Sequence, residues 1–223
     1  MYIGVFWFAL QIGLRADNPV DGVPFVVWLS VGMVPWFFMS AMLNVGSNVY
    51  IRYPYLVNRL RFPISVISTF YTMAQFIIFL MSMIIVAVVL VLCRVRVTIY
   101  LIQAPFIAIL MFVFWVLCSM MLSPLSALSR DFYNLVRALT TPLFWLSGTI
   151  FDISSINSHV IKWILAFNPI SFFVTGFRAA LCEEFWIWDD HRLLYPFLGV
   201  FAFVFLGALR IQHRLATEVG DVL

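Results

Sequence analysis

The sequence predicts an all-α integral membrane protein with about six transmembrane helices, and two observations lead to this fold class. The chain is 64% hydrophobic and 10% charged, with a mean hydropathy of +1.05, whereas soluble domains carry about 25% charged residues. Three runs, 22–51, 62–93 and 97–129, contain no charged residue. Each run is long enough for a spanning helix, which needs about 20 apolar residues because its backbone polar groups must bond within the segment.

The first two spans are separated by a turn. Met1–Leu14 is apolar and is followed by Arg15, and it is too short to cross a bilayer. We expect it to be the latter part of a first helix whose beginning is missing. Turn-forming residues at 17–19 lead to a second span over Pro24–Asn44. Two tryptophans of this span are candidates for the membrane interface or for a channel: Trp28 and Trp36.

A cationic segment, Arg52–Pro63, follows the second span and contains three arginines: Arg52, Arg59 and Arg61. Three apolar residues fall on another side of the helix that this spacing predicts: Leu56, Val57 and Leu60. This pattern indicates a short amphipathic helix at the membrane surface. The charges alone leave two roles open, anchoring to anionic headgroups and docking of a partner protein. Bidentate binding of a lipid diphosphate by these arginines is a further role.

Four more spans are expected. The third covers Ile64–Leu92, and the fourth covers Ile99–Leu122, where Ser123-Pro124 is expected to break it. A fifth apolar segment, Phe132–Ile150, contains Arg137, and a sixth span covers Leu193–Leu209.

Between the last two spans lie two short amphipathic pieces, Ser155–Phe167 and Ile170–Glu184, separated by Asn168-Pro169. Neither piece is long enough to cross a bilayer alone. We expect them to form a re-entrant or surface hairpin, which a membrane tolerates only where protein or water surrounds it. With no internal repeat and no linker, residues 1–223 are predicted to form a single transmembrane domain.

The orientation prediction places the Arg52–Pro63 segment in the cytoplasm. Alternating spans then leave seven Lys and Arg residues inside and six outside, which favours this orientation only weakly.

Several chemistries are disfavoured by the residues present. The single lysine, Lys162, lies in His-Val-Ile-Lys-Trp-Ile rather than in a Gly-Lys-Ser/Thr loop, so this polypeptide carries no P-loop ATPase. No basic face favours nucleic-acid binding. The three histidines are scattered, and the widely spaced cysteines are interpreted as packing thiols. The acidic pair of Asp189-Asp190-His191-Arg192 could bind Mg²⁺, but a solvated loop is the preferred interpretation. We therefore predict no metal site and no catalytic site on this chain.

The order of these features resembles the permease subunits of ABC-2 type exporters. The segment Tyr55–Pro63 is similar to the LV-x-(K/R)-x-x-FP pattern of the polysaccharide branch, and Val23–Gly32 is similar to the start of the second span in wall teichoic acid permeases. The resemblance covers essentially the whole chain and fits the teichoic acid branch best, with O-antigen and capsule permeases as near relatives. Other matching motifs are Ser129-Arg-Asp131, Asn168-Pro169, Phe177-Arg178 and Asp221-Val-Leu223.

The resemblance implies a half-transporter in the bacterial plasma membrane, with both termini in the cytosol. Two copies would form a channel, and each would bind a separate nucleotide-binding ATPase subunit that carries ATP and Mg²⁺, so no cofactor is expected on this chain. The substrate would be an undecaprenyl-diphosphate-linked wall teichoic acid. Family members begin with a cytosolic amphipathic helix and a complete first span, which we expect to be missing here.

The resemblance also assigns site residues. The amphipathic segment would be the coupling helix that contacts the ATPase, through Arg52, Tyr55, Leu56, Val57, Arg59, Leu60, Arg61 and Phe62. The hairpin would form extracellular gate helices, with channel or gate residues Trp145, Phe151, Trp163, Asn168, Arg178, Trp186 and Trp188. Two further arginines would bind the lipid diphosphate at the cytosolic mouth: Arg130 and Arg137.

Alternatives stay open for the residues and for the function. Aromatic side chains pack helices more often than they line channels, and Arg178 could form an ion pair with Glu183 or Glu184 instead of contacting substrate. The alternative functions are an O-antigen or capsular polysaccharide permease, an uptake or drug-efflux permease of the same superfamily, and a membrane enzyme that acts on a lipid-linked glycan.

Overall fold

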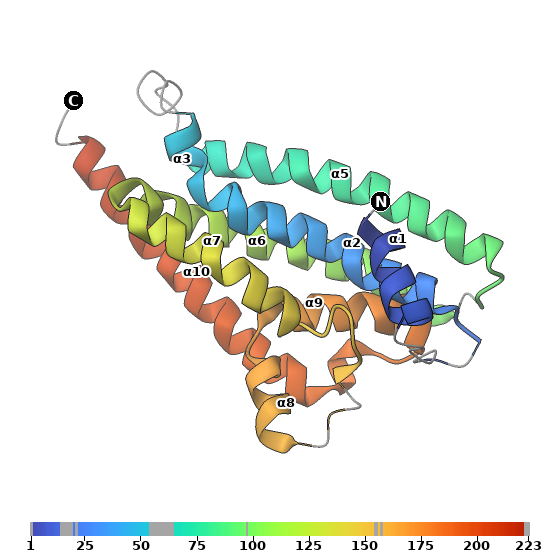
Figure 1. Cartoon of the computed structure of the whole chain (residues 1–223). Coiled ribbons are helices and arrows are strands. Elements are labelled where there is room, and N and C mark those ends of the chain that lie inside the picture. Colours follow the sequence, from blue (N-terminus) through green and yellow to red (C-terminus); the bar gives the residue numbers. More distant parts are fainter. Residues whose placement is uncertain are drawn as a thin grey trace.

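The fold is a bundle of long helices. The computed structural model describes residues 2–13, 20, 22–53, 65–96, 98–153, 156 and 158–220, with side chains as far as Arg214. Every regular element in these ranges is a helix, which confirms the all-α prediction. The bundle is built from four long helices (Figure 1), α2 (Phe25–Asn44), α5 (Ser65–Leu92), α6 (Gln103–Leu128) and α10 (His191–Gly220).

Four helical stretches of the described chain are long and apolar enough to cross a membrane: 25–52, 65–92, 99–128 and 191–214. The 28 residues of α5 extend over about 42 Å, beyond the roughly 30 Å of a hydrocarbon core. A bent helix pair at 159–183 raises the number to five if it counts as one span. The chain is thus a multi-pass membrane protein, with four or five spans by length and composition where the sequence predicts six.

The remaining two predicted spans correspond to shorter helices. At the N-terminal end, α1 (Tyr2–Trp7) continues as one turn of π-helix, η1 (Phe8–Gly13). The predicted fifth span corresponds to α7 (Arg130–Trp145), which has 16 residues and ends before the predicted boundary at Ile150. Ser129 caps this helix by accepting a hydrogen bond from the backbone N–H of Phe132.

Helix α2 is the centre of the bundle. It contacts α1, α5, α7 and α9 (Pro169–Arg178), and apolar residues lie all round it, as expected for a helix buried on every side. The predicted interface or channel positions of Trp28 and Trp36 are therefore wrong, since these side chains are only 1% and 7% exposed.

Helices α5 and α10 both carry long rows of exposed apolar side chains. Along α5 the exposed side chains include Phe70, Ile78, Ile84, Ile85 and Val91. Along α10 they include Tyr195, Leu198, Phe203, Leu206 and Leu209. Apolar faces of this extent are incompatible with water, so these helices contact lipid or another subunit.

The predicted break at Ser123-Pro124 is also wrong, because α6 continues through Pro124 to Leu128. Proline has no N–H to donate to the carbonyl four residues earlier, and that carbonyl belongs to Met120. Gln212 of α10 donates its Nε2 to the Met120 carbonyl at 3.1 Å, and to the Tyr50 hydroxyl at 3.4 Å. A neighbouring helix thus satisfies the backbone group that the proline leaves free.

The predicted pair of amphipathic pieces is present as two helices joined at a sharp bend. Helix α8 (His159–Ala166) meets α9 at 95°, and α9 continues into a π-helical turn, η5 (Ala179–Glu183). In Figure 1, α8 and α9 lie at the end of the bundle opposite α3 (Val49–Arg52) and the C-terminus. The long helices therefore separate the α8–α9 hairpin from Arg52, where the predicted coupling segment begins.

The role of Gln212 can be measured with a double-mutant cycle. Gln212→Leu should lower the free energy of unfolding by about 1–3 kcal/mol, because the Met120 carbonyl loses its donor. In a Pro124→Ala background the helix supplies its own N–H to that carbonyl, so the same change should cost less. SDS titration in mixed micelles measures both differences, and equal costs in the two backgrounds would contradict this role.

Candidate functional site

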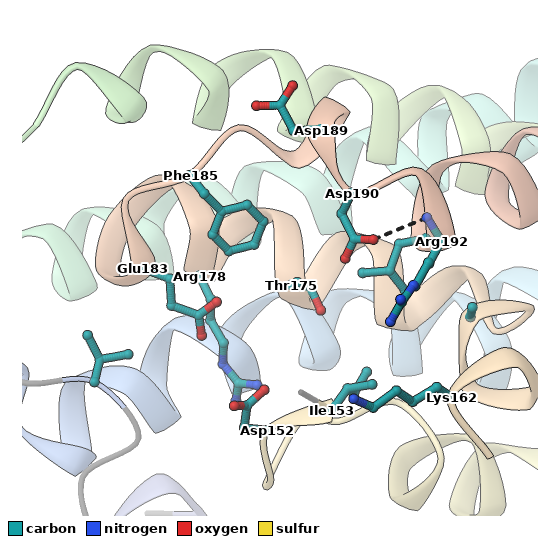
Figure 2. Close-up of a pocket in the computed structure, with 13 residues that line it drawn as sticks. Asp152, Ile153, Lys162, Thr175, Arg178, Glu183, Phe185, Asp189, Asp190 and Arg192 are labelled. Carbon is teal, nitrogen blue, oxygen red and sulfur yellow. Dashed lines mark hydrogen bonds between the residues drawn. The ribbon is translucent and has the colours of Figure 1, made fainter. Parts of the chain in front are cut away.

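A cavity of about 650 Å³, lined by both charged and apolar side chains, lies at the hairpin end of the bundle. The loop after α7, helices α8 and α9, and the segment leading into α10 form its wall. The charged side chains that line it are Asp152, Lys162, Arg178, Glu183, Asp189, Asp190 and Arg192 (Figure 2). Four of these are acidic and three are basic, so the cavity has charges of both signs.

Arg178 is buried where three parts of the chain meet. Its Nη1 donates to the Gly148 carbonyl and its Nη2 to the Thr149 carbonyl, each at 2.6 Å. The guanidinium carbon lies 3.3 Å from the centre of the Trp28 ring, a cation–π arrangement. These contacts connect α9 to α2 and to the loop after α7. Because a buried charge is costly unless it is paired or hydrogen-bonded, they explain how Arg178 is accommodated.

Two residues of the central helix complete this arrangement. Trp28 donates its indole N–H to Glu183 Oε1 at 3.0 Å, so the same ring contacts both Arg178 and Glu183. Gly32 lies one turn further along α2, and a Cβ there would be 2.5 Å from Arg178 Nη2. Only glycine leaves room for the guanidinium at this position. Trp28 and Gly32 are four residues apart in an apolar helix, and this spacing predicts that they share one face. Nothing in the sequence around them indicates that Arg178 is their partner.

The sequence left two roles open for Arg178, an ion pair with Glu183 or Glu184 and a contact with substrate. Glu183 and Asp152 both act on it electrostatically, and their carboxylates lie near the guanidinium in Figure 2. Its shortest polar contacts are nevertheless backbone carbonyls. The Nε atom has no hydrogen-bond partner among the described residues. Arg178 thus has a structural role, and it also lines the cavity.

Asn168 makes a second connection between α9 and α7. Its Oδ1 accepts from the backbone N–H of Ile170 at 3.1 Å and caps α9, with Pro169 at the first helical position. Its Nδ2 donates to the carbonyls of Leu143 and Leu146 at 3.3 and 3.2 Å. The bend between α8 and α9 is therefore fixed to the end of α7.

The acidic pair before α10 has a capping role. Asp190 accepts a hydrogen bond at Oδ1 from the backbone N–H of Arg192 at 3.1 Å (dashed in Figure 2), which is N-cap geometry for α10. Asp189 is exposed. Within the described part of the chain, no three His, Cys, Asp or Glu side chains are grouped as metal ligands. Asp189 ends a short 3-10 helix, η6 (Ile187–Asp189), and Asp190 joins it to α10, so the segment is a helix junction beside the cavity rather than the predicted loop.

The predicted gate aromatics fall into two groups. Trp145 and Trp163 are 55% and 49% exposed and lie on α7 and α8. Trp186 and Trp188 instead make edge-to-face contacts with Tyr100 and Phe106, at 5.2 and 5.1 Å between ring centres. Phe151, in the loop after α7, is half-buried. Trp145 and Trp163 are therefore the more accessible of the five, and the channel role of all five stays a prediction.

Helix α7 carries a polar stripe, of which the sequence predicted only the two arginines as site residues. Exposed polar residues recur at intervals of four, three and four, which places them on one face of the helix: Arg130, Asn134, Arg137 and Thr141. Trp145 follows four residues later at the hairpin end. The predicted diphosphate ligands Arg130 and Arg137 thus share a face of α7. The sequence prediction did not include Asn134 and Thr141, although their helical spacing from the arginines indicates the same face.

The predicted coupling segment is described only at its start. Arg52 ends α3 and is exposed at the end of the bundle away from the hairpin. The other predicted contacts lie outside the described residues: Tyr55, Leu56, Val57, Arg59, Leu60, Arg61 and Phe62.

The space at Gly32 gives a direct test of the Arg178 arrangement. Gly32→Ala should destabilise the protein by about 1–3 kcal/mol, because the new methyl group overlaps the guanidinium. Gly199→Ala is the matched control, since a Cβ there has no neighbour within 4 Å, and it should be neutral or slightly stabilising. Thermal unfolding followed by tryptophan fluorescence measures both. A Gly32→Ala cost that persists in an Arg178→Ala background would show that the overlap is not the cause.

Comparison with known proteins agrees with this architecture. The chain is 22% identical over 194 residues to the O-antigen export system permease protein RfbA of Myxococcus xanthus, an alignment that covers 86% of this chain and 70% of that protein. The sequence profile described as "ABC-2 type transporter" matches residues 1–182. The chain therefore belongs to the ABC-2 type transporter family.

Proposed function

We propose that this chain is the channel-forming permease subunit of an ATP-driven exporter for a lipid-linked cell-surface polymer. Two copies form the channel, each copy binds a separate ATPase subunit, and the polymer, on an undecaprenyl diphosphate carrier, moves to the outer side of the bacterial plasma membrane. Membership of the ABC-2 family supports the transporter class. The related O-antigen permease supports a polysaccharide as substrate.

The polar stripe of α7 carries this proposal. Arginine is costly in contact with lipid tails and in membrane proteins usually faces a water-filled cavity or a partner. Arg130 and Arg137 are exposed on α7, whereas the exposed residues along α5 are apolar. A polar path shared with a second copy accounts for this contrast, and it would extend from Arg130 to Trp145 at the hairpin.

The proposed topology has six crossings. The α1–η1 segment, which alone is too short to cross, belongs to the first of them, and the other five are α2, α5, α6, α7 and α10, with both termini and Arg52 in the cytosol. The α8–α9 hairpin then lies on the outer side and serves as the gate, with Trp145 and Trp163 presented to the emerging polymer. Asn168 and Arg178 transmit any displacement of α7 to this hairpin through their hydrogen bonds to the carbonyls of residues 143–149.

The polymer is proposed to be wall teichoic acid, because the motifs at Val23–Gly32 and Tyr55–Pro63 resemble that branch most. The identity to an O-antigen export permease favours O-antigen as the second candidate. Both polymers share a lipid diphosphate carrier, and Arg130 and Arg137 would contact it near the cytosolic mouth.

Depletion of this chain in its native cell tests the proposed function. Lipid-linked polymer should accumulate in the cytoplasmic leaflet, and its composition identifies the substrate. Polyol phosphate repeats would indicate a teichoic acid, and phosphate-free sugar repeats an O-antigen. Normal surface polymer with no lipid-linked intermediate after depletion would contradict the exporter assignment.

The stripe gives a prediction for transport. Arg137→Gln should reduce polymer export about tenfold, because one charge-assisted hydrogen bond to the diphosphate is lost. Since the side chain is exposed, the thermal unfolding midpoint should not change. Arg137→Lys keeps the charge and should retain more export than Arg137→Gln. Surface polymer per cell at equal protein level is the measurement, and full export by the glutamine variant would exclude Arg137 from the path.

The coupling segment gives a prediction for assembly. Arg59→Glu combined with Arg61→Glu should abolish co-purification of the ATPase subunit and export, because the changes reverse the charge of the proposed contact. Arg94→Glu, which the proposed topology places on the outer side, is the control and should leave co-purification intact. Undiminished co-purification of the double variant would show that these arginines anchor the segment to lipid instead.

A further inference from the structure

An apolar groove runs along the outside of the bundle between α5 and α6. Its main part has a volume of about 380 Å³, and it adjoins a smaller hollow of about 160 Å³ at the end of α5. The two spaces are continuous in their lining, because they share four residues: Ala87, Leu90, Leu101 and Leu181.

Small side chains leave a depression in this part of the surface. Ala104, Pro105 and Ala108 follow one another along α6 and face the groove, where longer side chains would fill the space. Phe79 and Phe177, both at most 3% exposed, form its buried wall. The groove is therefore a depression in an otherwise well-packed apolar surface, of a kind that suits a flexible hydrocarbon chain.

The smaller hollow ends at a cationic side chain. Arg96 lines it together with Thr98, Val91 and Val95. Arg96 is exposed, and among the described residues it has no ion pair and no side-chain hydrogen bond. An apolar groove that ends at a free guanidinium is complementary to an amphiphile with an anionic headgroup.

The position of Arg96 relative to the membrane agrees with this chemistry. Helix α5 ends at Leu92, four residues before Arg96. At the same end of the bundle, Tyr100 packs against Trp186 with 5.2 Å between ring centres. Tyrosine and tryptophan concentrate at the level of the lipid headgroups. The groove thus extends from hydrocarbon depth to headgroup depth.

We propose that the groove binds one acyl chain of an anionic membrane phospholipid whose phosphate contacts Arg96. The bound chain would lie against Leu181 of η5, three residues after Arg178, so the lipid would stabilise the end of the hairpin from the bilayer side. The proposal requires only that the chain spans a membrane, and it is independent of the polymer that is exported.

Photolabelling in vesicles tests this site. The full chain is reconstituted in phosphatidylcholine vesicles that contain a small fraction of phosphatidylglycerol with a diazirine on one acyl chain. After irradiation, the labelled peptides are mapped by mass spectrometry. The label should concentrate on the groove residues of α5 and α6, with much less on the exposed apolar face of α10.

Three variants sharpen the result. Ala108→Phe fills the groove and should remove most of the label, whereas Ile84→Phe, on an exposed part of α5 outside the groove, should not change it. In the native protein, label from phosphatidylglycerol should exceed label from an equally substituted phosphatidylcholine. Arg96→Gln should reduce that preference about fivefold, the effect of one arginine on an anionic lipid at the membrane surface.

Two outcomes would overturn the proposal. Label spread evenly over α5 and α10, or a headgroup preference that Arg96→Gln leaves unchanged, would show that the groove holds no specific lipid. Cross-linking of two protein copies through the groove residues would identify a second subunit as the occupant instead.

Discussion

The arrangement of this bundle depends on one buried cation, Arg178. In an apolar interior a guanidinium is tolerated only if its donors and its charge are matched, and here two backbone carbonyls and the Trp28 ring do this. These partners come from α2 and from the loop after α7, while Arg178 itself lies on α9. Satisfying one side chain therefore fixes three segments relative to one another, and Gly32 provides the space in which they meet.

Two other long-range polar contacts follow from the same requirement. Gln212 replaces the donor that Pro124 lacks, and Asn168 bonds two carbonyls at the end of α7. The Gln212 bond satisfies a carbonyl that Pro124 leaves without a helical donor, and the Asn168 bonds join the α8–α9 bend to the end of α7. Polar residues within the bundle thus determine where helices approach one another, while the apolar surface determines only that they are in a membrane.

These contacts also mark the limit of prediction from sequence. The bounds of α2 and α5 agree with the predictions to within one residue, because absence of charge over a long run is a local signal. The two pieces of the hairpin were also predictable from their length and from Asn168-Pro169. The continuation of α6 through Pro124 was not, since it depends on Gln212, which is far away in sequence. The partners of Arg178 were hidden for the same reason.

The candidate site was predictable to a similar degree. Arg130 and Arg137 were identified as a pair, and their helical spacing extends to Asn134 and Thr141 once the bounds of α7 are known. The cavity at the hairpin was not predictable, because Asp152, Lys162 and Arg192 come together only through the fold. Burial of Trp28 was missed because a tryptophan near a helix end resembles an interface residue until the surrounding helices are placed.

The proposed transport path along α7 and the proposed gate at Arg178 and Asn168 imply a channel subunit that takes its energy from a separate ATPase. The most direct measurement of this claim is transport in vesicles reconstituted with this chain, a candidate ATPase subunit and the lipid-linked polymer. Polymer should become accessible on the opposite leaflet only when both proteins and ATP are present. Equal accessibility without the ATPase subunit or without ATP would contradict the account.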